Sequence, residues 1–196
     1  MGQRRFFSTN NVINDQVTID GDEFHHAAKV MRCRLGDEME IINGRGGLLS
    51  GHITVFGNHF LQVHVERLQE FPMPTPRIII APSLTKGNAM NWMIEKLTEM
   101  GVEEIRPLLC ARTDVTYSPT QLRRWEKIAA QSLKVNKKYW LTRIAPPVSP
   151  AEMALQAAIM PGRILLDIAA QKRLGARFHF PALAVIGPPG DFTNEE

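Results

Sequence analysis

The carboxyl-terminal residues of the chain combine the residue types and the spacing of a ligand site. Leu183–Ile186 is a short apolar run typical of a buried strand. The Gly187-Pro188-Pro189-Gly190 segment after it can continue neither a strand nor a helix, so it predicts a tight turn. Thr193 and Glu196 stand at the spacing of a capping box, which predicts the start of a helix. Because open α/β sheets bind ligands at the carboxyl ends of their strands, we interpret this turn as a candidate small-molecule site.

A few other polar positions could carry chemistry: Lys86-Gly87, Arg112-Thr113 and Gln131-Ser132. The first two follow predicted strands, where sites form in α/β sheets. The chain has no GxSxG, HExxH or Walker A motif, and no GxGxxG follows the first strand of its second half. These absences argue against a serine hydrolase, a zinc protease, a P-loop enzyme and a dinucleotide-binding enzyme.

The second half of the chain must position these residues, and its pattern alternates strands with helices. The predicted strands are 77–81, 105–110, 164–166 and 182–186, and the predicted helices follow Gly87, Pro119 and Pro150. The apolar face expected on the first helix consists of Met90, Met93, Ile94, Leu97 and Met100, and Gly101 is expected to end that helix. The alternation predicts an α/β domain with a mostly parallel sheet covered on both faces.

The first half of the chain is predicted to be a small β-barrel. Its expected strands are 16–19, 39–42, 48–56 and 60–65, joined in part by glycine turns. Asp20 or Asp22 can cap one short helix that runs through Phe24 to Met31, after which Gly36 ends it. Three prolines between residues 72 and 76 predict a linker, because proline cannot donate to a sheet. We therefore expect one domain over residues 1–71 and a second over residues 72–196.

Charge and cysteine content narrow the class of protein. The chain of 196 residues has a net charge of +3, with 44% hydrophobic and 22% charged residues, which is ordinary for a globular protein. Residues 1–75 carry 7 Lys/Arg against 9 Asp/Glu and residues 76–196 carry 16 against 11, so the second half has the cationic excess that suits a polyanion such as RNA. The two cysteines, Cys33 and Cys110, lie far apart, so we expect reduced thiols in a cytoplasmic protein and no metal site. No apolar run is long enough to predict a membrane span.

Short matches spread over nearly the whole chain carry a resemblance to a known family. They are Arg5-Phe6-Phe7, His25-His26 with Val30-Met31-Arg32 and Gly36, Lys86-Gly87, Lys96–Val102, Ile105-Arg106-Pro107, Arg112, Arg124-Trp125, Ala129–Ser132, Ile186-Gly187-Pro188, Gly190, Phe192, Thr193 and Glu196. In this order they resemble the RsmE family of ribosomal RNA methyltransferases, which belongs to the knotted SPOUT class. No single motif is decisive, but the set is specific.

The resemblance implies an N-terminal PUA-like RNA-binding barrel and a C-terminal SPOUT methyltransferase domain that works as a homodimer. It implies S-adenosyl-L-methionine as the cofactor and methylation of N3 of a uridine in small-subunit ribosomal RNA as the reaction. The expected partner is this RNA or the assembled small subunit, and no association with a membrane is expected. The residues expected to bind the cofactor are Leu166, Ile186, Gly187, Pro188 and Gly190. The catalytic candidates are Arg112 and Lys86, and the RNA-binding candidates are Arg5, Arg32, Arg34 and Lys134.

The chain departs from the family pattern at three places. Pro189 stands where the family usually has glutamate, and Asp191 where it usually has glycine. Lys134 is the nearest cation where the family helix usually continues to an arginine, and lysine is the poorer bidentate ligand of phosphate. The family continues after the position of Glu196 with a helix, strand and turn that close the knot, so we expect a chain truncated at its C-terminus and an incomplete knot.

Two other functions are compatible with the sequence. One is a non-catalytic RNA-binding protein that keeps the barrel and the basic face without a working cofactor pocket. The other is an α/β enzyme for a small metabolite, which the lack of a nucleophile or metal motif argues against. Cofactor binding would separate the methyltransferase from the first alternative, and salt-sensitive RNA binding would separate both RNA proteins from the second.

Overall fold

The computed structural model describes residues 5–167, 170, 175 and 178–196. The chain forms two compact units: Met1–Met73 with Leu133–Trp140, and Pro74–Ser132 with Leu141–Glu196. It therefore enters the first unit twice, since the segment directly after Ser132 belongs to that unit. The expected boundary between residues 71 and 72 stays a prediction.

The first unit is built on a five-stranded sheet of order β1-β3-β4-β5-β2. Its strands are β1 (Arg5–Phe7), β2 (Gln16–Asp20), β3 (Glu38–Ile42), β4 (Gly47–Phe56) and β5 (Phe60–Glu70). β1 pairs parallel to β3, and the remaining pairs are antiparallel. The buried side chains of alternating strand positions, such as Phe6, Ile41 and Val63, form one apolar cluster. The predicted strands are confirmed, and β5 continues beyond the expected residue 65 to Glu70.

The helical segment of the first unit begins directly after Asp20, one of the two expected capping residues, although the Asp20 side chain makes no capping hydrogen bond, and the segment changes type along its length. α1 covers Gly21–His25 and continues as a π-helix, η1, over His26–Val30. Arg32 then adopts a left-handed φ of 52°, which ends the helix before Gly36. Phe24 and Ala27 are the residues that this segment buries against the sheet.

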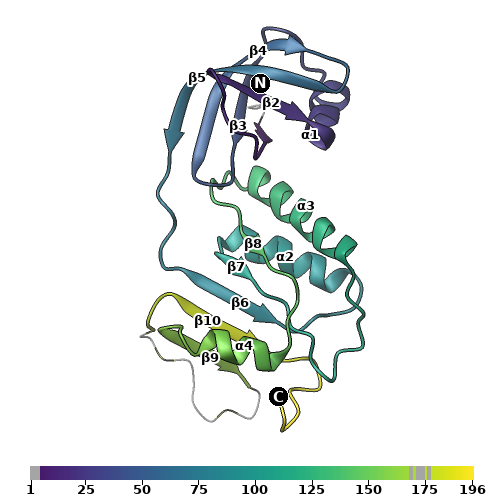
Figure 1. Cartoon of the computed structure of the whole chain (residues 1–196), viewed down its shortest axis with the longest axis vertical. Coiled ribbons are helices and arrows are strands. Elements are labelled where there is room, and N and C mark those ends of the chain that lie inside the picture. Colours follow the sequence, from purple (N-terminus) through teal and green to yellow (C-terminus); the bar gives the residue numbers. More distant parts are fainter. Residues whose placement is uncertain (1–4, 168–169, 171–174, 176–177) are drawn as a thin grey trace. The chain divides into compact units, whose positions relative to one another are not determined.

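The second unit has a five-stranded sheet of order β8-β7-β6-β10-β9, all of it parallel (Figure 1). Its strands are β6 (Ile78–Pro82), β7 (Glu104–Ile105), β8 (Arg143–Ile144), β9 (Gly162–Leu166) and β10 (Ala182–Ile186), and its helices are α2 (Asn88–Met100), α3 (Pro119–Val135) and α4 (Pro150–Ala157). The prediction of a parallel sheet is confirmed. The strand expected over 105–110 is much shorter, because Pro107 lacks the N–H that a ladder needs.

Alternate side chains of the central strand pack on opposite faces of this sheet. Ile80 belongs to a cluster with residues of α2 and α3, including Ile94 and Trp125. Ile79 belongs to a second cluster, with Leu183 of β10 and Met153 of α4. Both faces of the sheet are therefore covered, as the alternating sequence pattern predicts.

The buried stripe of α2 differs from the predicted one. Met90 and Ile94 are buried as expected, but Thr98 is 1% exposed and Met100 is 75% exposed. The buried positions follow a spacing of four residues along the helix, so Met100 lies outside the stripe. Gly101 ends the helix with a φ of 82°, which confirms the predicted glycine C-cap.

Candidate functional site

The carboxyl edge of the parallel sheet brings the predicted cofactor residues together. Ile186 at the end of β10 lies in register with Leu166 of β9 on one side and with Pro82 of β6 on the other. The Ser83 N–H donates to the Ile186 carbonyl at 2.8 Å, which extends the pairing one residue beyond β6. Two of the predicted residues, Leu166 and Ile186, are thus neighbours at the edge where parallel sheets bind ligands.

The turn after β10 is closed by its own backbone. The Asp191 N–H donates to the Pro188 carbonyl at 2.8 Å, and Asp191 takes a left-handed φ of 62°. The Asp191 carboxylate accepts the Phe192 N–H at 2.8 Å, which fixes this conformation from the side chain. A Cβ on Gly187 would lie 3.0 Å from the Phe192 ring and 3.1 Å from the Asp191 carboxylate, so Gly187 is packed as a glycine. The predicted tight turn is confirmed.

A second loop, residues 110–114, is joined to this turn by hydrogen bonds. The Arg112 guanidinium donates to the carbonyl of Gly190 and, at 3.5 Å, to that of Asp191. The Glu196 carboxylate accepts the Ala111 N–H at 2.6 Å and the Thr193 N–H at 3.1 Å. These two backbone hydrogen bonds lower the pKa of Glu196, since they favour its charged form. We name these contacts of Arg112 and Glu196 with the turn and the loop the latch.

The Glu196-to-Thr193 contact is one half of the predicted capping box, in which the acidic side chain accepts the N–H of the capping residue. The second carboxylate oxygen of Glu196 reaches Ala111, a contact that the spacing of Thr193 and Glu196 cannot predict. Glu196 therefore joins the turn to a loop 85 residues earlier in the chain.

Three small side chains anchor the 110–114 loop, although no sequence motif marks them. The buried Ser83 hydroxyl lies 2.9 Å from the Thr113 hydroxyl, which also accepts the Cys110 N–H at 3.3 Å. Burial raises the pKa of the Cys110 thiol, so this side chain acts as a small buried group and not as a thiolate. Thr113 is already a candidate in the sequence beside Arg112, whereas Ser83 is not. Ser83 directly follows β6, and that position at a strand end is the signal that would have found it.

Lys86 and Arg112, the two catalytic candidates, have different partners. The Lys86 ammonium forms an exposed ion pair with Asp114 at 3.1 Å. The Arg112 guanidinium instead donates to the Gly190 carbonyl of the turn, as part of the latch. Lys86 binds a residue of the 110–114 loop, and Arg112 belongs to that loop. Of the two, only Lys86 is paired with a solvent-exposed carboxylate, which a substrate could displace.

The four RNA-binding candidates fall into two pairs, all four within the first compact unit. Arg5 binds Glu40 through two nitrogens, at 2.8 and 3.1 Å, and lies over the Tyr139 ring. Lys134 binds Glu23, and both cationic side chains are only 10% exposed. Arg32 and Arg34, in contrast, are exposed. The charges of Arg5 and Lys134 are thus already neutralised inside the protein, whereas those of Arg32 and Arg34 face solvent.

The edge around Ile186 has the features that a nucleoside-type cofactor requires. β9 is one of the two edge strands of this sheet, and Leu166 at its end is 45% exposed and lies in register with Ile186. Gly187 and Gly190 add backbone without side chains, and a Cβ on Gly190 would be 3.4 Å from Arg112. Apolar side chains can pack against an adenine ring, and backbone without side chains can bind the polar atoms of adenosine and methionine. The residues present therefore fit S-adenosylmethionine.

Metal-binding clusters and membrane helices are both absent from the described residues. No group of three or more His, Cys, Asp or Glu side chains could hold a metal ion within residues 5–167, 170, 175 and 178–196. Over that same part of the chain, no helix has the length and apolar character needed to cross a membrane.

Comparison with known proteins adds two family models and several relatives. A model for an RNA methyltransferase domain matches residues 72–196, and one for an RNA methyltransferase PUA domain matches residues 19–66. The chain is 27% identical to ribosomal RNA small subunit methyltransferase E of Synechocystis over all of its own length and 67% of that protein. It is 26% identical to the protein of the same name from Buchnera aphidicola over 61% of the chain and 51% of that relative. The matches thus span between half and two thirds of these relatives.

Solved structures show the same fold. One is a ribosomal RNA small subunit methyltransferase E from Neisseria gonorrhoeae bound to S-adenosyl methionine, with a TM-score of 0.81 and 21% identity over 99% of the chain and 83% of that structure. Another is a methyltransferase from Legionella pneumophila in complex with the same cofactor, with a TM-score of 0.84 and 20% identity over 100% and 84%. The mixed N-terminal sheet followed by a parallel α/β sheet confirms the predicted fold class, and the expected incomplete knot stays a prediction.

Proposed function

Because the chain belongs to the RNA methyltransferase family, we propose that it transfers a methyl group from S-adenosylmethionine to N3 of a uridine in small-subunit ribosomal RNA. The observation that carries the proposal is the latched glycine turn at the carboxyl edge of the sheet, inside the region that the methyltransferase model matches. The names of the Synechocystis and Buchnera relatives support small-subunit ribosomal RNA as the substrate. The choice of N3 of uridine follows the family resemblance.

In this proposal Leu166 and Ile186 would hold the cofactor by apolar contact, and the backbone of the Gly187–Gly190 turn would bind its polar atoms. Bound there, it supplies an electrophilic methyl group on a sulfonium. The protein's own task is to exclude water and to orient the uridine, whose N3–H is a poor nucleophile until its proton leaves. For transfer to N3, the N3 proton would have to leave to a base while the methyl carbon exchanges its bond to sulfur for a bond to N3.

We assign different roles to the two catalytic candidates. Arg112 holds the Gly190 carbonyl, so it positions the cofactor turn. Lys86 pairs with the exposed Asp114, so it can exchange that partner for the uridine or its phosphate. A base in folded RNA must also be exposed before it can react, and Arg32 and Arg34 of the first unit are available to hold the backbone during this step.

The experiment combines calorimetry with methyl transfer. Small ribosomal subunits that lack the modification are incubated with the chain and S-adenosylmethionine, and the methylated nucleoside is identified by mass spectrometry. Lys86→Ala is expected to lower kcat by about 100-fold, the scale of a lost acid–base or positioning group, with cofactor Kd unchanged. Arg112→Ala is expected to weaken cofactor binding as well, because it frees the turn.

The outcomes separate the functions considered. Methyl on a uridine carbon or on another base would overturn the N3 assignment and keep the methyltransferase. RNA binding without cofactor binding would support the non-catalytic alternative. Equal activity of Lys86→Ala and the unchanged chain would show that Lys86 is not a catalytic residue. Sedimentation of the purified chain tests the proposed homodimer, and fractionation of cells that express the chain tests the proposed cytoplasmic location.

A further inference from the structure

One side of α3 carries a row of exposed cations. Arg123, Arg124 and Lys127 are all exposed, and Thr120 and Gln131 extend the row toward the two ends of the helix. Thr120, Arg124, Lys127 and Gln131 follow one another at spacings of three or four residues, and Arg123 lies three residues after Thr120 and four before Lys127, so all five share one face of the helix. We name this set the α3 cation face.

Burial of the opposite side fixes the direction of this face. Trp125 and Ala129 are buried in the cluster that α3 shares with α2 and the sheet. The first turn is also held, since the Gln121 side chain accepts the Ser118 N–H at 2.7 Å, as in a capping box. A helix anchored in this way presents its cations in one direction and loses little further order on binding.

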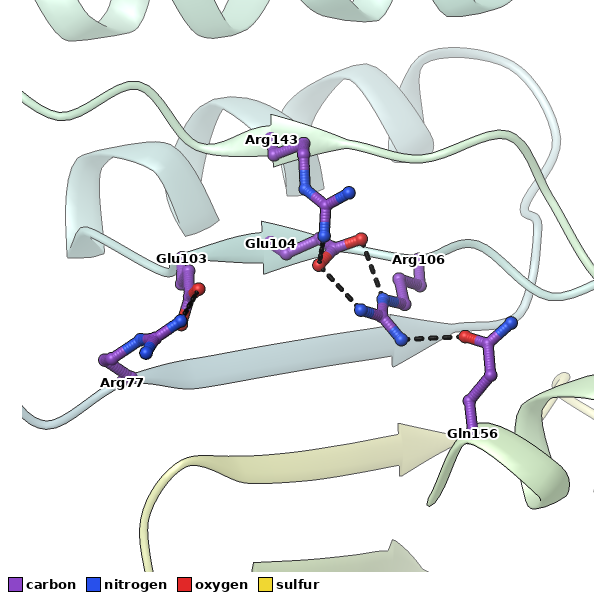
Figure 2. A network of polar contacts seen from close by, with 6 residues as sticks. All are labelled: Arg77, Glu103, Glu104, Arg106, Arg143 and Gln156. Atoms are coloured by element: carbon purple, nitrogen blue, oxygen red, sulfur yellow. Dashed lines mark hydrogen bonds and ion pairs between the residues drawn. The ribbon is translucent and has the colours of Figure 1, made fainter. Parts of the chain in front are cut away.

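Several arginines of the same unit are neutralised by carboxylates, whereas those of the α3 cation face are not. Figure 2 shows the neutralised ones: Arg77 pairs with Glu103, and Arg106 and Arg143 both pair with Glu104, which is 1% exposed. Within the part of the chain that the structure describes, neither the Arg123 nor the Arg124 side chain has a hydrogen bond or an ion pair. The single carboxylate of α3, Glu126, is exposed beside them.

We infer that the α3 cation face binds the phosphate backbone of the ribosomal RNA substrate. The inference rests on the proposed function, and it adds a binding surface in the methyltransferase unit to the candidates of the first unit. Unpaired guanidinium groups are the side chains best suited to bidentate binding of phosphate. The face has no exposed large apolar residue over positions 120–131, so it lacks the apolar centre that a protein partner would need.

The charge of the face can be changed in both directions without touching the core. Arg123→Glu combined with Arg124→Glu reverses two cations, and Glu126→Lys adds one at an exposed position of the same helix. Arg163→Glu is the matched control, because Arg163 is another exposed cation of this unit, on β9 and outside α3.

The test measures the Kd of small-subunit ribosomal RNA for the full chain and each variant, as a function of salt. The double variant is expected to weaken binding by at least about tenfold and to lower the slope of log K against log salt by about two, one for each phosphate that is no longer neutralised. Glu126→Lys is expected to tighten binding, and Arg163→Glu to leave both values unchanged. The Kd for S-adenosylmethionine should be the same in all four proteins.

The failures of the two proposals are distinguishable. If the unchanged chain methylates the RNA and the double variant has the same Kd and salt slope, the α3 cation face does not bind RNA and the proposed function stands. If the unchanged chain neither binds nor methylates the RNA, the proposed function fails. If instead the double variant loses capture of a ribosomal protein and keeps RNA binding, the face is a protein interface and the inference is wrong.

Discussion

At the scale of single residues, the candidate site depends on which backbone conformations each residue allows. Asp191 stands where the resembling family has glycine, and its φ of 62° lies in the region that glycine enters freely. Aspartate tolerates this region better than most residues because its short side chain hydrogen-bonds nearby backbone, here the Phe192 N–H. The departure from the family pattern therefore leaves the shape of the turn intact.

Gly187→Ala tests whether this shape binds the cofactor. The new Cβ would lie 3.0 Å from the Phe192 ring, so either the ring or the turn must move. Such overpacking costs about 1–3 kcal/mol, which we expect to appear as a rise in the Kd of S-adenosylmethionine of about ten- to 100-fold. Isothermal titration calorimetry measures the change.

Gly190→Ala is the matched control for this prediction. A Cβ at Gly190 meets only the Arg112 side chain, at the ordinary distance of 3.4 Å. We therefore expect a much smaller rise in Kd. Equal effects of the two substitutions would show that the packing of Gly187 against Phe192 does not shape the pocket.

At the scale of elements, the ends of helices were easier to predict than the residues they bury. α4 begins with a full capping box: the Ser149 hydroxyl accepts the Glu152 N–H at 3.2 Å, and the Glu152 carboxylate accepts the Ser149 N–H at 2.8 Å. The sequence analysis predicts this helix start from Pro150 alone, although the spacing of Ser149 and Glu152 also indicates a capping box. The cap holds the helix whose Met153 covers the sheet beside β10.

Ser149→Ala is expected to lower the free energy of unfolding of this unit by about 1 kcal/mol, because one N–H of the first turn loses its acceptor. Urea denaturation measures the loss. Glu152→Gln keeps an acceptor at the same position and should cost clearly less. A loss of equal size in both variants would show that the charge of Glu152 contributes as much as the Ser149 acceptor, and the prediction would be wrong.

At the scale of the whole molecule, ion pairs across strands make stability depend on pH. Arg77 joins the start of β6 to Glu103 at the start of β7, and its hydrogen bonds lower the pKa of that carboxyl from the ordinary value of 4.5 (Figure 2). A lowered pKa means that the pair stabilises the folded state above pH 4.5, and that this stabilisation is lost as the pH falls further. Glu152 and Glu196 have lowered pKa values for a related reason, hydrogen bonds from backbone N–H groups.

Glu103→Gln is therefore expected to reduce stability near neutral pH and to flatten the fall of the melting temperature below pH 4.5. Thermal melts from neutral pH into the acid range measure the profile. Glu126→Gln serves as control, because the Glu126 side chain has no ion pair or hydrogen bond with any residue that the structure describes. If the two profiles coincide at every pH, the Arg77 pair contributes nothing to acid stability.

The tertiary structure also decides which residues form the first compact unit. Leu133–Trp140 belongs to it although the segment overlaps and follows the end of the methyltransferase helix α3 in sequence. Tyr139 stacks on Phe71 with ring centroids 3.7 Å apart, and the Trp140 indole donates to the Phe71 carbonyl at 2.9 Å. No local pattern in residues 133–140 predicts these partners, because Phe71 lies 69 residues before Trp140 in the chain.

The sequence by itself determined the parallel sheet, the glycine turn after β10 and the family, because hydrophobic periodicity, glycine and proline act over a few residues. Only the tertiary structure decided that Arg112 and Glu196 latch that turn, that Arg5 and Lys134 are neutralised by Glu40 and Glu23, and that Arg123 and Arg124 remain unpaired among the described residues. The physical reason is that the partner of a charge is chosen by distance in space, and these partners come from distant positions in the chain.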